Sequence, residues 1–210
     1  MAVLTVSRQY GAGGRQVAAM AADLLGFTLV DREPMEEAAR RVGVDPETAR
    51  AWDERAPAII EELGIALAAG TPLVGGGPAP QFDPNGLSDT ALAEATRRVI
   101  VSLADTGDYV ILGRGAQVAL RDRPDTVHIA LVAELGDRMK RIMDSQGVDE
   151  KEARARCERV DAERAGYVRH YYGQDIRNPL LYDATLNTSR LGVEGAAGLA
   201  VDLTRRRLAR

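Results

Sequence analysis

The stretch Val3-Leu4-Thr5-Val6-Ser7-Arg8-Gln9-Tyr10-Gly11-Ala12-Gly13-Gly14-Arg15 decides the fold of this chain. Residues 3–6 form a short apolar run that ends in polar and glycine residues, which is typical of a buried parallel strand. Residues 15–25 carry apolar side chains at helical spacing, and Gly26 predicts the end of that helix. A glycine-rich segment between a strand and a helix gathers backbone N–H groups at a helix N-terminus, which suits phosphate. We therefore interpret Gly11 to Gly14 as a phosphate-binding loop, with a simple tight turn as the alternative.

Strands and helices are predicted to alternate along the rest of the chain. Further strands are expected at 27–30, 109–112, 126–132 and 183–186, and helices at 33–42, 46–55, 59–69, 88–105, 134–145, 149–172 and 192–208. Residues 70–86 contain too many glycines and prolines for regular structure, which predicts a loop or hinge. This alternation predicts an α/β three-layer sandwich with a five-stranded parallel sheet and right-handed crossovers.

Composition narrows the classes of protein to consider. A length of 210 residues fits one domain, and the formal net charge of -4 gives no broad positive field for a nucleic acid duplex. Cys157 is the single cysteine, so no internal disulfide and no zinc cluster is expected, which favours a reducing, cytoplasmic location. No predicted segment suits a membrane span or a secretion signal. The oligomeric state does not follow from the sequence.

Asp31 leaves a dinucleotide-binding interpretation open. It ends the second predicted strand about twenty residues after Gly11, where an acid that binds a ribose would lie in an NAD-dependent oxidoreductase. Two features count against this alternative. The third glycine of that motif would fall at Gln16, and the arginine-rich stretch 149–172 has no role in hydride transfer.

Several short motifs together resemble the cytidylate kinase-like branch of the P-loop nucleoside monophosphate kinases. They are the opening loop, Val30-Asp31-Arg32-Glu33, Gly113-Arg114-Gly115, the pair Asp161 and Arg164, and the segment from Tyr182 to Thr188. The resemblance implies a P-loop kinase fold with a helical lid, in one domain over 1–210. Residues 32–87 would be an acidic helical region that binds the acceptor, and 149–178 an arginine-rich lid. It also implies phosphoryl transfer from ATP, with Mg²⁺, to a (d)CMP-like acceptor.

The same resemblance assigns candidate site residues. The nucleotide phosphates would be bound by Ser7, Gly11, Ala12, Gly13, Gly14, Arg15 and Gln16, the acceptor by Asp31, Arg32 and Arg114, and catalysis would use Arg15, Arg159, Asp161 and Arg164. Arginines suit this task because positive groups offset the charge of a phosphoryl group in transfer. For the arginines of 149–172 the alternative is a solvated helix face with weak ion pairs. Asp31 has the alternative role of a helix N-cap, and no metal ligand is assigned.

The loop departs from the usual phosphate-binding consensus. That consensus places Gly-Lys-Ser/Thr after the inner glycines, but this chain has Gly14 at the lysine position and Arg15 and Gln16 at the hydroxyl positions. Arg15 is the expected replacement for the missing charge, because guanidinium groups pair well with phosphate oxygens. Three functions remain from these observations. The first is a kinase, and the second is a catalytically inactive nucleotide-binding module that serves regulation or assembly. The third is the dinucleotide-binding oxidoreductase.

Overall fold

The computed structural model describes residues 1–31, 97 and 100–209. The predicted helices at 33–42, 46–55 and 59–69, the predicted loop at 70–86 and Arg32 lie outside the described residues. By its internal contacts the chain divides into two compact units, residues 1–29 with 104–210 and residues 30–103. The first unit contains the glycine-rich loop and nearly all of the sheet.

Over the described residues, the sheet has five strands, as predicted. They are β1 (Val3–Arg8), β2 (Thr28–Val30), β3 (Tyr109–Leu112), β4 (Thr126–Val132) and β5 (Ala184–Asn187), in the order β2-β3-β1-β4-β5. β1 pairs in parallel with β3 and with β4, and β4 pairs in parallel with β5. Val6 lies opposite Leu112 on one side and Ile129 on the other. The carboxyl ends of these strands therefore meet at one edge of the sheet.

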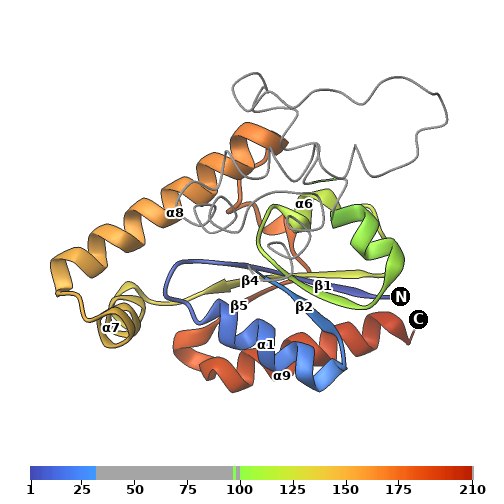
Figure 1. Ribbon diagram of the computed structural model, residues 1–210, viewed down its shortest axis with the longest axis horizontal. Helices are drawn as coiled ribbons and strands as arrows, with labels where there is room; N and C mark the ends of the chain where they lie inside the picture. The colour runs from blue at the N-terminus through green and yellow to red at the C-terminus, as the bar shows by residue number, and fades with distance from the viewer. Residues whose placement is uncertain (32–96, 98–99, 210) are drawn as a thin grey trace, which may run out of the picture. The chain divides into compact units, whose positions relative to one another are not determined.

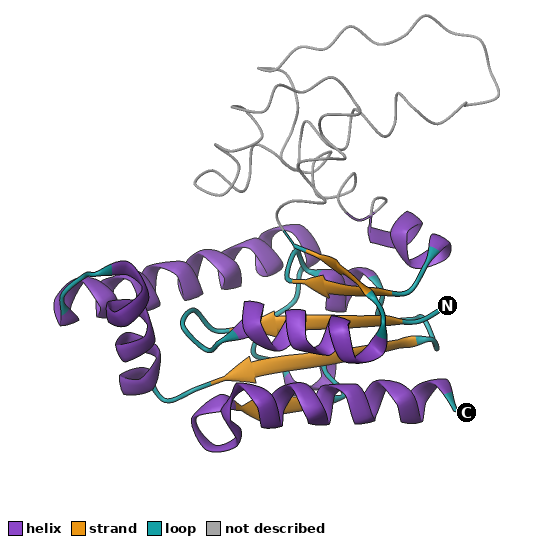
Figure 2. Cartoon of the chain, turned by 60° about the horizontal axis from the view of Figure 1, so that its bottom comes forward, coloured by secondary structure: helices purple, strands orange, loops and turns teal. Residues whose placement is uncertain are grey.

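Helices cover both faces of this sheet. They are α1 (Gly14–Leu25), α6 (Ala116–Ala119), α7 (Leu135–Gln146), α8 (Glu150–Tyr172) and α9 (Thr188–Leu208), with a further helical segment at 100–106 and a 3-10 turn at Pro179–Leu181. Figure 1 shows α1 and α9 side by side on one face and α6 on the other, and Figure 2 shows the first two from below. α7 follows the carboxyl end of β4, and α8 packs against α7. Of the helices described, none is both long enough and apolar enough to cross a bilayer.

Small apolar residues hold α1 and α9 against each other and against the sheet. α1 buries Val17, Ala18 and Ala21, which recur at helical spacing and form one face. α9 buries Ala197 and Ala200 in the same cluster. Because these side chains are short, the two helices can pack closely. Each square ångström of apolar surface that this packing removes from water contributes about 25 cal/mol to the stability of the fold.

Among the described residues, the predicted strands and helices are confirmed to within a few residues, with three informative differences. Of the helix predicted at 88–105, only 97 and 100–105 are described, and they are helical. β1 continues two residues beyond the predicted end, because Ser7 and Arg8 stay in register with β4. α9 begins at Thr188 and not at Gly192. Gly192 has φ 69° and ψ 177° and breaks the helix at the point where the sequence predicted its start. α6, a helix of four residues, was not predicted because it is too short to show a period.

The strand order argues against the dinucleotide-binding alternative. In that fold the second strand lies beside the first, so an acid at its end reaches a ribose held at the first glycine loop. Here β3 lies between β2 and β1. Asp31 therefore follows a strand that is one place further from the loop than that motif requires.

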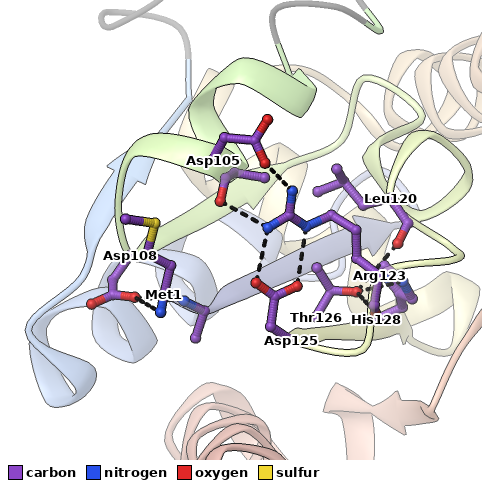
Figure 3. Close-up of polar contacts among 10 residues, drawn as sticks. Met1, Asp105, Asp108, Leu120, Arg123, Asp125, Thr126 and His128 are labelled. Carbon is purple, nitrogen blue, oxygen red and sulfur yellow. Dashed lines mark hydrogen bonds and ion pairs between the residues drawn. The ribbon is translucent and has the colours of Figure 1, made fainter.

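A charged cluster around Arg123 ties elements together at the amino edge of the sheet (Figure 3). The guanidinium of Arg123 donates to both carboxylate oxygens of Asp125, at 3.0 and 2.9 Å, and also to Asp105. Its third contact is the carbonyl oxygen of Ala104 at 3.1 Å. The bonds to Asp125 and Asp105 raise the pKa of Arg123 further above its ordinary value, and the bond to Arg123 lowers the pKa of Asp125. Because Asp125 directly precedes β4, the cluster fixes the start of that strand.

Candidate active site

The glycine-rich loop lies at the carboxyl edge of the sheet, between β1 and α1. β1 lies in the middle of the sheet, between β3 and β4. The strands that follow β1 in the chain, β2 and β3, lie on one side of it, and the later strands, β4 and β5, lie on the other. The direction in which strands are added therefore reverses at β1. In open parallel sheets, ligands bind at such a reversal. Gly13 caps α1 with φ 75° and ψ 19°, and the first bond within the helix runs from Val17 N to Gly13 O at 3.0 Å. The N–H groups of the first turn precede that bond and have no partner within the helix.

Two glycines of the loop are required by both conformation and space. Gly11 has φ 76°, and a Cβ atom there would lie 2.7 Å from the carbonyl oxygen of Arg138. Gly13 has φ 75°, and its Cβ would lie 3.0 Å from Cγ2 of Val193. Both backbone angles are in the left-handed region that side chains other than glycine rarely adopt. The loop therefore packs directly against α7 and α9, with its backbone as the contact surface.

α8 holds the start of the loop through Asp161 and Arg164. Asp161 accepts a hydrogen bond from Tyr10 N at 2.7 Å through one oxygen and from Arg138 Nη1 at 2.6 Å through the other. Arg138 is 8% exposed, so this ion pair is largely removed from water. Arg164 donates to the carbonyl oxygen of Arg8 at 3.0 Å, and its guanidinium lies 5.7 Å from the centre of the Tyr10 ring. These two residues therefore fix the backbone of the loop.

α7 and α9 hold the rest of the loop. Arg141 donates through Nη1 to the carbonyl oxygen of Gly11 at 3.1 Å and through Nη2 to that of Thr188 at 3.3 Å. The buried hydroxyl of Thr188 donates to the carbonyl oxygen of Ala12 at 3.0 Å. Carbonyl oxygens repel phosphate, and these helices bind several of the loop's carbonyl oxygens. The loop is therefore arranged so that an anion would meet N–H groups.

A second unusual turn follows β3, next to β1. Gly113, Arg114 and Gly115 have φ values of 81°, 62° and 70°, and Arg114 is the one non-glycine residue with positive φ among those described. Gly113 N donates to the carbonyl oxygen of Val6 at 3.0 Å, which ties the turn to β1. The Tyr172 ring packs against Gly115, and its hydroxyl donates to Arg114 O at 3.3 Å. A left-handed arginine costs about 1–2 kcal/mol, and such strain is often found at functional sites.

Ser7 belongs to a buried polar group beside the loop. Its hydroxyl oxygen lies 3.3 Å from that of Tyr182, which donates to the carbonyl oxygen of Ile176 at 2.8 Å. Burial raises the pKa of Tyr182, so its hydroxyl keeps its proton at neutral pH. Gln117 Nε2 completes the group at 3.5 Å from the tyrosine oxygen. These contacts join the carboxyl end of β1 and the segment that precedes β5 to α6.

The structure brings some predicted site residues together and separates others. Ser7, Gly11 to Gly14, Asp161 and Arg164 lie in or against the loop. Arg15 and Gln16 are exposed on the first turn of α1, and Arg114 is on the turn after β3. Arg159 contacts Glu163 at 3.8 Å, with both side chains about two thirds exposed (66% and 64%), which is the geometry of a surface ion pair. Asp31 follows β2 directly and belongs to the second compact unit.

Sequence reasoning missed the residues that hold the loop from α7. Arg138 and Arg141 were not candidates, because the dense arginines of α8 gave the stronger pattern. A signal was nevertheless present, since the two lie three residues apart on a helix that begins just after the carboxyl end of β4. Thr188 was part of the resemblance without a role of its own. Arg8 was treated as part of the loop sequence and received no role either.

The described residues do not fit a magnesium ion held by the protein alone. Among them, no group of three or more histidine, cysteine, aspartate or glutamate side chains converges on a common point. Arg15 stands where the consensus loop has the serine or threonine that binds magnesium. The carboxylate of Asp161, which contacts the loop, already accepts hydrogen bonds from Tyr10 and Arg138 through its two oxygens.

Solved structures with similar coordinates share the fold. An uncharacterized protein from Eubacterium ventriosum superposes with a TM-score of 0.69 at 19% identity, over 98% of this chain and 99% of that one. Shikimate kinase from Bacteroides thetaiotaomicron gives a TM-score of 0.53 at 13% identity, with 100% and 99% covered. A gluconokinase from Sinorhizobium meliloti gives 0.53 at 12% identity, with 99% and 96% covered. At these identities the comparison shows the fold alone, which is that of the P-loop kinases.

Sequence comparison gives the family. A cytidylate kinase from Methanoculleus marisnigri is 33% identical over 124 residues, which are 58% of this chain and 65% of that protein. The match thus spans a little under two thirds of the curated relative. The model of the cytidylate kinase-like family matches residues 3–190, which include both the glycine-rich loop and the turn at Gly113 to Gly115. The chain belongs to the cytidylate kinase-like family.

Proposed function

We propose that this protein transfers the γ-phosphoryl group of ATP to a nucleoside monophosphate, with a (d)CMP-like nucleotide as the preferred acceptor. One observation carries the proposal. The loop at the N-terminus of α1 lies beside the strained turn that contains Arg114, at the carboxyl edge of two paired strands. Donor and acceptor phosphates bound at these two places would approach each other, and family membership favours this reaction.

The donor phosphates would be bound by the loop and the first turn of α1. N–H groups of Gly13, Gly14, Arg15 and Gln16 are at the helix N-terminus, where the helix dipole favours an anion. Gly11 and Ala12 give the loop its shape, and Ser7 supports it from the buried side. The guanidinium of Arg15 adds positive charge near the phosphates in this proposal.

The acceptor would be bound by Arg114, Asp31 and Arg32. Arg159, Asp161 and Arg164 belong to the proposed lid at 149–178, and residues 32–87 form the proposed acceptor-binding region. The contacts of Asp161 and Arg164 with the loop backbone suggest that these two position the loop as well as the phosphates. Arg159 would need to leave Glu163 to reach a nucleotide, and its exposed ion pair opposes that motion only weakly.

The proposed reaction balances simply. The bond between the γ-phosphorus and the oxygen that bridges it to ADP breaks, and a bond forms between that phosphorus and a phosphate oxygen of the acceptor. ADP and a nucleoside diphosphate are the products. Mg²⁺ would accompany ATP, bound mainly through the nucleotide's own phosphates. These substrates fit the cytoplasmic location that the composition favours.

The test measures ADP release with each common ribo- and deoxyribonucleoside monophosphate in turn. The proposal predicts turnover that depends on the acceptor, with CMP or dCMP giving the highest kcat/KM. ATP hydrolysis without any acceptor serves as the background. Turnover no higher than background with every acceptor would contradict the kinase proposal.

The second candidate is a nucleotide-binding regulatory module with the same fold. The observation that favours it is the consensus loop's missing lysine and hydroxyl at Gly14 and Arg15. Calorimetry distinguishes the two functions. Tight ATP binding without turnover would support the module, and ready turnover would exclude it. A fluorescence titration with NADH that shows no binding would remove the dinucleotide alternative as well.

A further inference from the structure

The loop differs from the usual phosphate-binding consensus at two positions that complement each other. The consensus Gly-x-x-x-x-Gly-Lys has glycine first and lysine last. When its second glycine is placed on Gly13, the first glycine falls on Arg8 and the lysine on Gly14. The chain therefore has a cation where the consensus has glycine, and a glycine where the consensus has the cation.

The structure shows that these two positions are in contact. A Cβ atom added to Gly14 would lie 2.6 Å from Cγ of Arg8, 3.0 Å from its Cβ and 3.3 Å from its Cδ. The aliphatic part of the Arg8 side chain thus lies directly on Gly14. Gly14 is within α1 and has no positive φ, so its backbone conformation does not require glycine. Space for Arg8 is the reason that the structure gives for a glycine there.

The guanidinium of Arg8 extends from Gly14 to the turn that follows β3. A Cβ atom added to Gly113 would lie 2.0 Å from Nη1 and 3.1 Å from Cζ of Arg8. The side chain therefore crosses from the end of β1, over the first residue of α1, to Gly113. The backbone of Arg8 is fixed as well, since Arg164 donates to its carbonyl oxygen at 3.0 Å. Arg8 thus places a positive charge between the donor loop and the turn that contains Arg114.

We infer that Arg8 takes over the task of the consensus lysine, and that Gly14 is the matching change that gives it room. This inference rests on the proposed function, because it assigns the cation that contacts the phosphates of ATP at that site. Arg8 would donate N–H groups to oxygens of the transferred phosphoryl group, which a planar guanidinium does in a bidentate manner. Its charge would offset the charge on that group while the bond to ADP breaks and the bond to the acceptor forms. Arg15 would then have a lesser role than the sequence alone suggested.

The test restores the consensus in two steps. Arg8→Gly removes the cation, Gly14→Lys places a side chain against the stem of Arg8, and the double variant Arg8→Gly/Gly14→Lys recreates Gly-x-x-x-x-Gly-Lys. We expect each single variant to lower kcat/KM with ATP and CMP by about 1000-fold. We expect the double variant to recover to within about tenfold of the wild type.

Three further variants complete the series. Arg8→Lys is expected to keep more activity than Arg8→Gly, because it keeps the charge. Arg15→Ala is expected to lower kcat/KM by no more than about tenfold, as for an exposed cation. Arg206→Ala, an exposed arginine in the last turn of α9, serves as the control and is expected to have no effect. Circular dichroism and thermal unfolding of every variant show whether a loss of activity is a loss of folding.

Several outcomes would overturn the inference. The first is an Arg8→Gly variant that folds and keeps its activity within threefold of the wild type. The second is a double variant that folds but is no more active than the single variants. The third is an Arg15→Ala variant that loses more activity than Arg8→Gly. If the wild type binds ATP but phosphorylates no acceptor, the kinase proposal fails and Arg8 is judged by calorimetry alone. In that case Arg8→Gly must weaken ATP binding at least tenfold more than Arg15→Ala does, and equal affinities would overturn the inference. Absence of ATP binding by the wild type would overturn both proposals.

Discussion

Arginines gather at both edges of the sheet, and the two groups have different partners. At the amino edge, Arg123 donates to two carboxylates, those of Asp105 and Asp125, so its charge is neutralised within the fold. At the carboxyl edge, Arg138 pairs with Asp161, whereas Arg141 and Arg164 donate to main-chain carbonyl oxygens of the loop, at 3.1 and 3.0 Å. A carbonyl oxygen stabilises a cation without cancelling its charge. The first arrangement strengthens a structural junction, and the second binds carbonyl oxygens of the loop that would otherwise repel an anion.

This difference cannot be read from the arginines themselves. A guanidinium in a sequence pattern gives no information on whether a carboxylate or a carbonyl will be its partner. The distinction comes from the fold, because the amino edge of a parallel sheet joins chain segments and the carboxyl edge gathers ligand-binding loops. Variants at each edge can show whether the two edges have separate tasks.

Among the variants that test this comparison of the two edges, the largest effect is expected at Gly11. Gly11→Ala adds a Cβ atom 2.7 Å from the carbonyl oxygen of Arg138, so the loop must move away from α7. A displacement near 1 Å costs roughly 100-fold in catalysis, and we expect at least that loss in kcat/KM with ATP and CMP. Gly26→Ala is the matched control, since Gly26 has a similar φ of 71° but nothing within 4 Å of the added atom. Equal activity losses in the two variants would contradict the packing argument.

The next effect concerns the ion pair that holds the loop from α8. Asp161→Asn leaves Arg138, which is 8% exposed, without its carboxylate. Breaking a buried pair in this way costs about 3 kcal/mol, measured as the free energy of unfolding in urea, and KM for ATP should rise as well. Glu163→Gln, on the same helix, removes an exposed carboxylate that pairs with Arg159 at 3.8 Å. Its cost should stay below about 0.5 kcal/mol, and a larger cost than that of Asp161→Asn would refute this assignment.

At the amino edge we expect stability to change without activity. Arg123→Ala removes the bonds to Asp105 and Asp125 and should lower the free energy of unfolding by about 2 kcal/mol. The KM for ATP should stay within twofold of the wild type, because the cluster is at the far edge of the sheet. Arg121→Ala serves as the control, since Arg121 is 55% exposed and pairs only with its exposed neighbour Asp122 in the contacts described. An Arg123→Ala variant with a raised KM for ATP and an unchanged free energy of unfolding would contradict the structural role of this cluster.

The smallest effect is a pH dependence from His128, which lies within the sheet. Its ring contacts Thr5 Oγ1 at 2.7 Å and Thr126 Oγ1 at 3.3 Å, and burial lowers its pKa below the ordinary value. The unfolded chain then binds a proton more readily than the folded one. Neutral His128 therefore contributes its full stabilisation above about pH 6.5. As the pH falls below that value, the free energy of unfolding decreases by at most about 1.4 kcal/mol per pH unit.

Urea unfolding at pH 7.5 and pH 5.5 measures this contribution. His128→Gln has no ring to protonate, so its stability should fall less than that of the wild type between the two pH values. A larger fall in the variant would show that the sign is wrong. Comparing the difference between the two proteins, and not the wild type alone, removes the effect of other titrating groups.

The fold was largely predictable because its signals are local. The apolar runs of β3 and β4 have clear ends, and their predicted bounds are those observed. The left-handed cap at Gly26 and the N-cap at Asp149 also follow rules that involve only neighbouring residues. Cys157, the single cysteine of the sequence, is buried, and burial raises the pKa of its thiol.

The site was only partly predictable because its contacts join distant segments. Arg141 meets Gly11 across 130 positions of sequence, and no local period indicates such a pair. The role of Gly14 is a stronger example. Its neighbours along the chain suggest a flexible turn, whereas the structure shows a helical residue that makes room for the side chain of Arg8. Space of this kind exists only once the chain has folded.

Transfer of a labelled γ-phosphoryl group from ATP to CMP is the most direct measurement of the central claim. The protein would be mixed with γ-labelled ATP and unlabelled CMP, and the products would be separated after times that span a single turnover. The account predicts that the label appears in CDP as the label in ATP declines. Label found only in inorganic phosphate, or retained in ATP after every common nucleoside monophosphate has been tried, would contradict it.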